Sequence, residues 1–388
     1  MRQVQLIAST AFGLESIVAH ELRKLGYSNL TTENGRVLFA ADISALARCN
    51  LWLRSADRLL LKIGAFPART FEELFENTRS LPWNDWIPAD AEFPVEAKSI
   101  KSKLFSVSDC QAIVKKAIVE KMKEKHHLNW FPENGSRFRI QLGLLKDTAT
   151  LSIDSSGIGL HKRGYRKLSA EAPLKETLAA AMIQLSRWKA DRALIDPFCG
   201  SGTIPIEAAL IGKNIAPGLG RSFAAENWPQ LPAQLWKKTR EEARDSIDHE
   251  QPLGILGFDI DPAVLDLARF HAKEAGLKNL ISFQQQDVRD LRSKYNFGYL
   301  IANPPYGERL AEKKEVEKLY KDLAPVFDRL DTWSFYLLSS HPGFEKLIQR
   351  KANKKRKLYN GRIQCNYYQF FGPRPQNLKG PFAKPNAD

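Results

Sequence analysis

The 388-residue sequence is poor in cysteine: it has four, Cys49, Cys110, Cys199 and Cys365, and they stand far apart. None forms the C-x-x-C spacing of a zinc or redox site, so we expect no metal and no disulfide framework. No apolar run approaches the roughly 18 residues of a membrane-spanning helix, and the N-terminus lacks the apolar stretch of a secretory signal. These absences predict free thiols in a reducing cytoplasm and no membrane segment.

Acidic residues are scarce beside the basic ones, since 44 Asp and Glu oppose 58 Lys and Arg, a net charge of +14. The excess is concentrated near the C-terminus, where residues 346–388 hold eleven Lys and Arg but one acid, Asp388. A second basic stretch covers residues 98–125. Such a charge favours a polyanionic partner, either nucleic acid or an anionic membrane surface.

Apolar periodicity divides the chain into an α+β half and an α/β half. Residues 3–8 and 36–40 alternate like strands, whereas residues 11–25 have helical spacing and are followed by a stop at Gly26. From about residue 190 onward, strands alternate with helices, which indicates a parallel sheet covered on both faces. Residues 161–176 read as a connector between the halves, and residues 213–252 read as an insertion in the second.

A glycine-rich turn, DPFCGSGT at residues 196–203, follows an apolar strand and opens a predicted helix. It has neither the third glycine of a dinucleotide site nor the Gly-Lys of a P-loop. Glycines allow a ligand to approach the backbone, and the free N–H groups of the helix can hold it. The carboxylate before the turn suits a cationic ligand such as S-adenosylmethionine, although an ordinary structural βα turn is the alternative. The candidate cofactor ligands here are Asp196, Pro197, Phe198, Gly200, Gly202 and Thr203.

Two further predicted strands also end in acids, the first at Asp259-Ile260-Asp261 and the second at Asp287-Val288. A carboxylate at a strand end can accept both hydroxyls of a ribose, and Asp287 could accept from the amino group of an adenine. Each acid alone is more often a solvated strand end or a helix cap. Three such strand ends in succession favour a nucleoside site.

The sharpest signal is Asn303-Pro304-Pro305-Tyr306, which follows the apolar residues 299–302. The prolines fix an extended turn and donate no N–H, so their carbonyls can accept from a ligand. The Asn303 oxygen and the Pro304 carbonyl could hold both hydrogens of an exocyclic amine, while Tyr306 stacks on its base. Asn303, Pro304 and Tyr306 are therefore the candidate catalytic residues; a structural proline-rich turn is the alternative.

The turn at 196–203 together with NPPYGER at 303–309 resembles the class I S-adenosylmethionine-dependent RNA amino-methyltransferases. With the connector motifs RGYR at 163–166 and APLKE at 172–176, it is most similar to the THUMP-domain guanine-N2 methyltransferases of the bacterial 23S ribosomal RNA type with a single methyltransferase domain. The resemblance implies an α+β N-terminal region followed by a Rossmann-like α/β domain. Its expected parts are a ferredoxin-like subdomain at 1–54, an RNA-binding THUMP domain at 55–160 and the methyltransferase domain at 161–388.

By the same resemblance, Asp196, Gly200 and Gly202 hold the methionine part of S-adenosylmethionine, Asp259 holds the ribose and Asp287 meets the adenine. Asn303 also belongs to the cofactor set and, with Pro304 and Tyr306, presents a guanine. The expected partner is RNA, either 23S ribosomal RNA or a ribosomal precursor particle. Three alternatives stay open: a tRNA guanine-N2 enzyme, a DNA adenine-N6 methyltransferase, and a non-catalytic ribosome-assembly factor. The candidate RNA contacts are Lys98, Lys101, Lys103, Arg163, Arg166, Arg309, Lys354, Lys355, Arg356 and Lys357.

Overall fold

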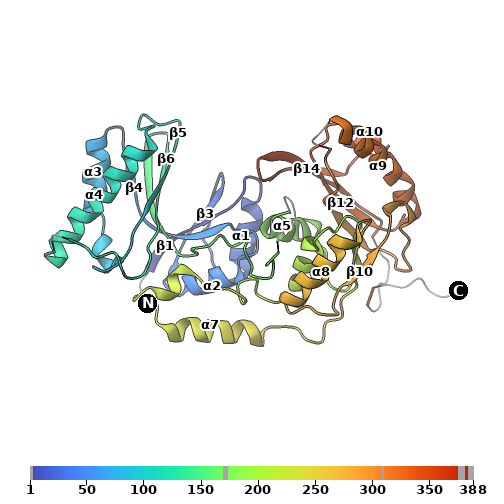
Figure 1. The fold of residues 1–388 in the computed structure, drawn as a ribbon, viewed down its shortest axis with the longest axis horizontal. Coiled ribbons are helices and arrows are strands. Elements are labelled where there is room, and N and C mark those ends of the chain that lie inside the picture. Colours follow the sequence, from blue (N-terminus) through green and yellow to red (C-terminus); the bar gives the residue numbers. More distant parts are fainter. Residues whose placement is uncertain (1–2, 129, 169–173, 308–309, 375–380, 383–388) are drawn as a thin grey trace.

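The computed structural model describes residues 3–128, 130–168, 174–307, 310–374 and 381–382, and these form two seven-stranded sheets (Figure 1). In spatial order, the N-terminal sheet contains β2 (Thr31–Glu33), β3 (Arg36–Asp42), β1 (Gln3–Ser9), β4 (Arg58–Pro67), β7 (Thr148–Asp154), β6 (Ile140–Leu145) and β5 (Val95–Ile100). The C-terminal sheet contains β10 (Ser282–Gln285), β9 (Ile255–Asp259), β8 (Leu194–Asp196), β11 (Tyr299–Ala302), β12 (Ser334–Ser339), β14 (Ile363–Phe370) and β13 (Lys354–Asn360).

The N-terminal sheet joins two parts of the chain through one long strand, β4. Its first half pairs antiparallel with β1, and it also pairs along its length with β7. The expected α+β organisation is confirmed, and the two expected units share a continuous sheet. The helices of this half are α1 (Glu15–Lys24), α2 (Ala45–Trp52), α3 (Phe71–Ser80) and α4 (Val107–His126), with a 3₁₀ turn η1 (Trp83–Asp85).

The C-terminal sheet is mostly parallel, as expected for a Rossmann-like domain. Strands β10, β9, β8, β11 and β12 run parallel, and β14 is antiparallel to β12 and β13. The helices are α5 (Glu176–Ser186), α6 (Thr203–Gly212), α7 (Ala233–Asp245), α8 (Pro262–Glu274), α9 (Leu310–Arg329) and α10 (Phe344–Leu347), with 3₁₀ turns η2 (Ala224–Asn227) and η3 (Val288–Asp290). Because β8 lies between β9 and β11, the strand order reverses at β8, which is where α/β sheets place ligands.

The predicted insertion packs against the N-terminal half, where its helix α7 lies beneath α2 (Figure 1). The Trp228 ring stacks on Phe138 with centroids 5.1 Å apart, and Phe223 stacks on Trp236 at 5.6 Å. The buried insertion residues in the N-terminal core are Phe223, Ala225, Trp228, Leu231 and Trp236. The core of the first half is therefore completed by residues that the chain supplies only after it has entered the second.

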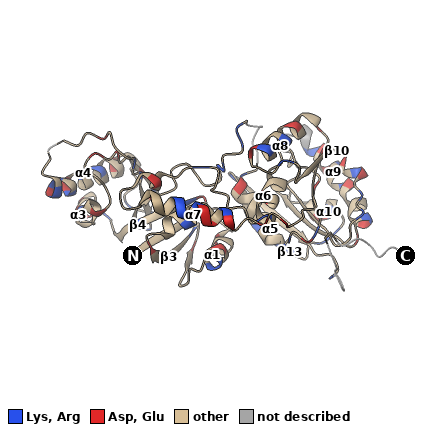
Figure 2. Cartoon of the chain, turned by 90° about the horizontal axis from the view of Figure 1, so that it is seen from below, with Lys and Arg blue, Asp and Glu red and all other residues tan. Residues whose placement is uncertain are grey.

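Charged side chains of both signs are mixed along the surface helices, as Figure 2 shows for α7 and α9. Part of the expected excess of Lys and Arg near the C-terminus, at residues 354–357 and Arg362, lies on the hairpin of β13 and β14, which the sequence pattern did not predict. Among the described residues, no helix has both the length and the apolarity needed to cross a bilayer.

Candidate active site

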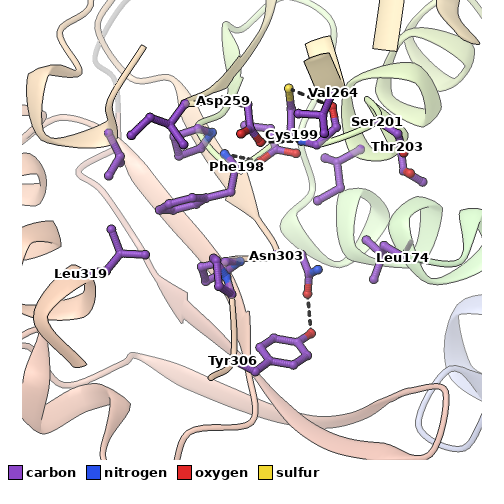
Figure 3. A pocket seen from close by; sticks show the side chains of 18 of the residues that line it. Leu174, Phe198, Cys199, Ser201, Thr203, Asp259, Val264, Asn303, Tyr306 and Leu319 are labelled. Carbon is purple, nitrogen blue, oxygen red and sulfur yellow. Dashed lines mark hydrogen bonds between the residues drawn. The ribbon is translucent and has the colours of Figure 1, made fainter. Parts of the chain in front are cut away.

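A cavity of about 1080 Å³ opens at the carboxyl ends of β8, β9 and β11 (Figure 3). Two of the predicted cofactor residues, Gly202 and Asp261, do not line it. The predicted residues that do are Asp196, Pro197, Phe198, Gly200, Thr203, Asp259, Ile260, Asp287, Val288, Asn303, Pro304 and Tyr306. The fold thus brings four separate sequence segments to one site at the switch point of the sheet.

Asp196 is a buried carboxylate that lines this cavity, with 1% of its surface exposed. Its Oδ1 accepts from the backbone N–H of Phe198 at 3.1 Å. Burial raises the pKa of Asp196 well above its ordinary value, and the nearby Asp259 carboxylate adds to this shift. Within the described part of the chain, no Lys, Arg or His forms an ion pair with Asp196. A ligand that brings an ammonium group would supply the missing cation, so the site fits the amino-acid end of S-adenosylmethionine.

Asp259 ties the glycine turn to the end of β9. Its Oδ2 accepts from the Gly200 N–H at 2.9 Å, and its Oδ1 accepts from the Asp261 N–H at 3.1 Å. Asp261 instead caps α8, because its carboxylate accepts from the Ala263 N–H at 2.9 Å. Asp259 is therefore held at the cavity wall by backbone bonds, while Asp261 serves the helix that follows.

The turn itself depends on Gly202, whose φ of +83° is costly for any residue with a side chain. A Cβ at this position would lie 3.0 Å from Cβ of Ala268 on α8 and 3.2 Å from the Phe283 ring. Gly202 thus allows α6 to begin in close contact with Ala268 and Phe283. Cys199, in the same turn, is buried, and burial raises the pKa of its thiol, which disfavours the thiolate that a nucleophile needs.

Asp287 lies at the third strand end, as predicted, but its carboxylate already has a partner. It accepts from the Arg289 side chain and from the Arg289 N–H at 2.9 Å, which caps η3. The Arg289 guanidinium lowers the pKa of Asp287, which favours the ionised form of this carboxyl. Its contact with an adenine stays a prediction.

The Asn303 turn enters the cavity directly after β11 (Figure 3). The Tyr306 hydroxyl donates to Oδ1 of Asn303. The Pro305 carbonyl accepts from the Tyr320 hydroxyl of α9 at 2.6 Å, and Asn360 at the end of β13 donates to the Tyr306 hydroxyl at 3.4 Å. Burial raises the pKa of the Tyr306 phenol, and the neighbouring Cys365 thiol adds to the shift. The sequence did not point to Tyr320 or Asn360, because both are distant from the motif along the chain.

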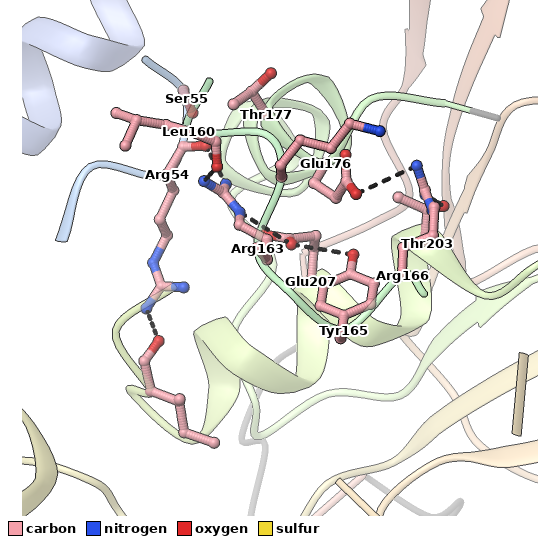
Figure 4. Close-up of polar contacts among 12 residues, drawn as sticks. Arg54, Ser55, Leu160, Arg163, Tyr165, Arg166, Glu176, Thr177, Thr203 and Glu207 are labelled. Carbon is pink, nitrogen blue, oxygen red and sulfur yellow. Dashed lines mark hydrogen bonds and ion pairs between the residues drawn. The ribbon is translucent and has the colours of Figure 1, made fainter. Parts of the chain in front are cut away.

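Two predicted RNA contacts, Arg163 and Arg166, are corrected by their positions (Figure 4). Arg163 is 4% exposed and pairs with the buried Glu207 of α6, with Nε and Oε1 3.4 Å apart. The Arg166 side chain is 9% exposed, pairs with Glu176 at 3.2 Å and donates to the Thr203 hydroxyl. Both guanidinium groups therefore attach the connector to the methyltransferase half, and because they are largely buried, they are not exposed to an RNA backbone.

The other basic candidates are divided between two places. Lys98 and the following Lys101 and Lys103 lie at or just after the edge strand β5. Lys354 to Lys357 are the first four residues of β13, where Lys355 pairs with Glu345 at 2.7 Å and the Arg356 guanidinium binds the Gly13 carbonyl. Arg309 lies outside the described residues. The exposed lysines can meet a phosphate backbone, whereas Arg356 is engaged within the protein.

The sheet, the switch-point cavity and the acid-ended strands define a class I methyltransferase, the enzyme class whose methyl donor is S-adenosylmethionine. Three family descriptions match the chain: a ferredoxin-like domain of the RlmL type at residues 5–60, a THUMP domain at 68–154, and an RMKL-like methyltransferase domain at 163–369. The chain belongs to this RMKL-like methyltransferase family with a THUMP domain.

Two known proteins align with almost the whole chain. One is "Putative RNA methyltransferase YpsC" of Bacillus subtilis, 50% identical over 382 residues that cover 98% of this chain and 99% of that protein. The other is "Ribosomal RNA large subunit methyltransferase K/L" of Syntrophotalea carbinolica, 34% identical over 95% of this chain. The chain spans about half, 53%, of the length of that second relative.

Solved structures share the complete architecture. A protein described as a predicted N6-adenine-specific DNA methylase from Listeria monocytogenes is 51% identical, with a TM-score of 0.92 over 96% of this chain and 97% of its own. SMU.472, a putative methyltransferase solved with S-adenosylhomocysteine, is 46% identical, with a TM-score of 0.92 over 97% of this chain and 100% of its own.

Proposed function

We propose that this chain methylates the exocyclic N2 amine of a guanine in RNA, with 23S ribosomal RNA as the target molecule. The observation that carries the proposal is the position of Asn303, which lines the same cavity as the glycine turn and whose side-chain oxygen accepts from Tyr306. A carboxamide oxygen is the kind of acceptor that can hold the N–H of a base amine. S-adenosylmethionine would supply an electrophilic methyl group bonded to a sulfonium, whose sulfur leaves as the neutral thioether of S-adenosylhomocysteine.

The residues of this chain mainly bind and orient. Asp196 would neutralise the ammonium of the donor, Asp259 would accept from its ribose, and Asp287 would accept from its adenine. Asn303 and the Pro304 carbonyl would each accept one hydrogen of the target amine, which turns the nitrogen lone pair toward the donor. Tyr306 would stack on the base. Positioning of this kind can supply most of the acceleration, and no strong base is required because the N–H of the amine becomes acidic once the methyl group is attached.

The choice of RNA is supported by the THUMP domain and by the names of both relatives. The choice of 23S ribosomal RNA is supported by the large-subunit name of the Syntrophotalea relative. Because that relative is about twice as long, its substrate is a proposal for this chain. A cytosolic location, expected from the four widely spaced cysteines, belongs to the same proposal, and all four thiols are buried.

A DNA adenine amine is the second candidate, because the Asn303 turn fits either amine and the Listeria relative carries that description. The test offers tritiated S-adenosylmethionine with RNA from cells lacking the protein, with tRNA from the same cells and with unmethylated DNA. Nucleoside digestion then identifies the product. We expect N2-methylguanosine in 23S ribosomal RNA. Label found only in N6-methyladenine, or only in tRNA, would overturn the proposal.

A further inference from the structure

The C-terminal hairpin reaches from the N-terminal half of the protein to the Asn303 turn. Its strand β13 presents Arg356, Leu358 and Asn360 on one face, because alternate side chains of a strand point the same way. The hairpin closes in a two-residue turn that starts with Gly361, whose φ is +62°, and Asn360 pairs with Ile363 across it. The tip residues Asn360 and Gly361 line the active-site cavity.

The base of this strand face is anchored to the loop before α1. The Arg356 Nε and Nη2 donate to the Gly13 carbonyl at 2.9 and 2.6 Å, and Nη2 also donates to the Ser16 hydroxyl at 2.7 Å. A Cβ at Gly13 would lie 2.6 Å from the Lys357 carbonyl oxygen, so the two segments are in close contact. These contacts hold β13 against the loop before α1, although Arg356 and Gly13 are 343 residues apart in sequence.

At the other end of the face, a directed chain of hydrogen bonds starts from Asn360. Its Nδ2 can only donate, and it donates to the Tyr306 hydroxyl oxygen. The hydroxyl in turn donates its proton to Oδ1 of Asn303. Because the hydroxyl proton is directed to Asn303, this bond fixes which end of the Asn303 carboxamide is the acceptor.

We propose that Asn360 is a positioning residue for methyl transfer: through the Tyr306 hydroxyl, it holds the Asn303 carboxamide with Oδ1, not Nδ2, toward the target amine. Oδ1 has a second lone pair, which remains available to the amine while Tyr306 occupies the first. A carboxamide flipped the other way would present N–H groups to the N–H groups of the base. The inference rests on the proposed function, because it assigns Asn303 as the acceptor for the amine.

The test reverses the direction of the chain of hydrogen bonds without changing its shape. Asn360→Asp replaces the amide donor with a carboxylate that accepts, so the Tyr306 hydroxyl is drawn away from Asn303. We expect kcat to fall about tenfold, which corresponds to one hydrogen bond of about 1.4 kcal/mol. We expect Tyr306→Phe to lower kcat by a similar factor. The control is Gln364→Glu, which adds the same charge to the same hairpin on an exposed side chain.

The double variant decides whether Asn360 acts through Tyr306. In the Tyr306→Phe background, we expect Asn360→Asp to change kcat less than twofold, with the affinity for S-adenosylhomocysteine and the unfolding midpoint near wild type throughout. Wild-type turnover in Asn360→Asp would overturn the inference. So would a double variant whose kcat is reduced by the product of the two single reductions, because the residues would then act independently. The readout is total label transferred to RNA from cells lacking the protein. Product identity is read separately, so a methylated atom other than guanine N2 would sink the proposed function alone.

Discussion

The Tyr306 hydroxyl donates to Oδ1 of Asn303, so two side chains three residues apart form one hydrogen-bonded unit on the cavity wall. Both follow β11, and the prolines between them set the extended backbone that lets the side chains meet. The carboxamide is therefore ordered before any base arrives. An acceptor that is already oriented need not be reorganised during the reaction, which is the main advantage of a preformed site.

Removing this acceptor should separate catalysis from cofactor binding. We expect Asn303→Ala to lower kcat by about a hundredfold to a thousandfold, because a positioned group that acts in the transition state has this order of effect. Its affinity for S-adenosylhomocysteine should change less than about threefold, since Asp196 and Asp259 remain. Single-turnover methylation and calorimetry measure the two quantities. Near-normal turnover would remove Asn303 from the assigned role.

Cofactor affinity should depend on pH through Asp196. Burial raises the pKa of this carboxyl, so it becomes protonated at a higher pH than an exposed aspartate would. The charge that attracts an ammonium is lost as the pH falls through that raised pKa, and affinity for S-adenosylhomocysteine should fall with it. Asp196→Asn should bind about ten- to a hundredfold more weakly at alkaline pH and flatten the dependence. Titration calorimetry across pH measures both, and an unchanged slope in the variant would contradict this origin.

Gly202 and Gly200 provide a matched pair for the glycine turn. Gly202→Ala combines a positive φ with contacts of 3.0 and 3.2 Å, and we expect it to cost about 2–3 kcal/mol of unfolding free energy. Gly200→Ala has a φ of +49° but no atom within 4 Å of its Cβ, so it should cost about 1 kcal/mol. Urea denaturation compares them. Equal effects of the two substitutions would show that packing against α8 does not matter.

The exposed lysines of β13 should act through RNA phosphates. Replacing both Lys354 and Lys357 with glutamine should weaken RNA binding and reduce the slope of log affinity against log salt by about 0.7–0.9 for each phosphate that is no longer neutralised. The control is Lys278→Gln, an exposed lysine just before β10, the strand at the opposite edge of the sheet from β13. Filter binding at several salt concentrations gives the slopes. If both proteins kept the wild-type slope, β13 would not be part of the RNA surface.

We expect Arg163 to contribute to the free energy of unfolding and not to the electrostatic attraction of RNA. Arg163→Ala leaves Glu207 buried without its cation, which typically costs about 3–5 kcal/mol. The comparison is Lys238→Ala, which removes an exposed partner of Glu242 on α7 and should cost less than about 1 kcal/mol. Denaturant unfolding measures both. A mild decrease in stability at Arg163 accompanied by a reduced salt slope would restore its predicted role in RNA binding.

Local patterns allowed the strand ends and the turns of the candidate site to be predicted, because each depends on neighbours in sequence. The acid after β9 and the Asn303 motif after β11 both lie where the alternation of strands and helices puts them. Long-range contacts could not be read in this way. Arg163 and Lys354 have the same charge, and only the fold shows that the first is buried against Glu207 while the second is exposed.

The hairpin of β13 and β14 was missed for a related reason. Its lysine-rich first strand has the composition of a solvated segment, and it becomes a strand because β14 pairs with both β13 and β12. Asn360 therefore gave no signal, since its partner Tyr306 lies 54 residues earlier. Side chains that act by holding another residue are the least visible in a single sequence.

The segment of residues 213–252 leaves the methyltransferase sheet, buries Trp228 and Trp236 in the first half, and returns to begin β9. The polypeptide thereby threads the two halves together twice, once through the connector and once through this excursion. Cutting the chain at one position and removing or exchanging either half would therefore expose these tryptophans or leave a cavity beside Phe138. Gene fusion can lengthen such a protein at its ends, but recombination between its halves is penalised.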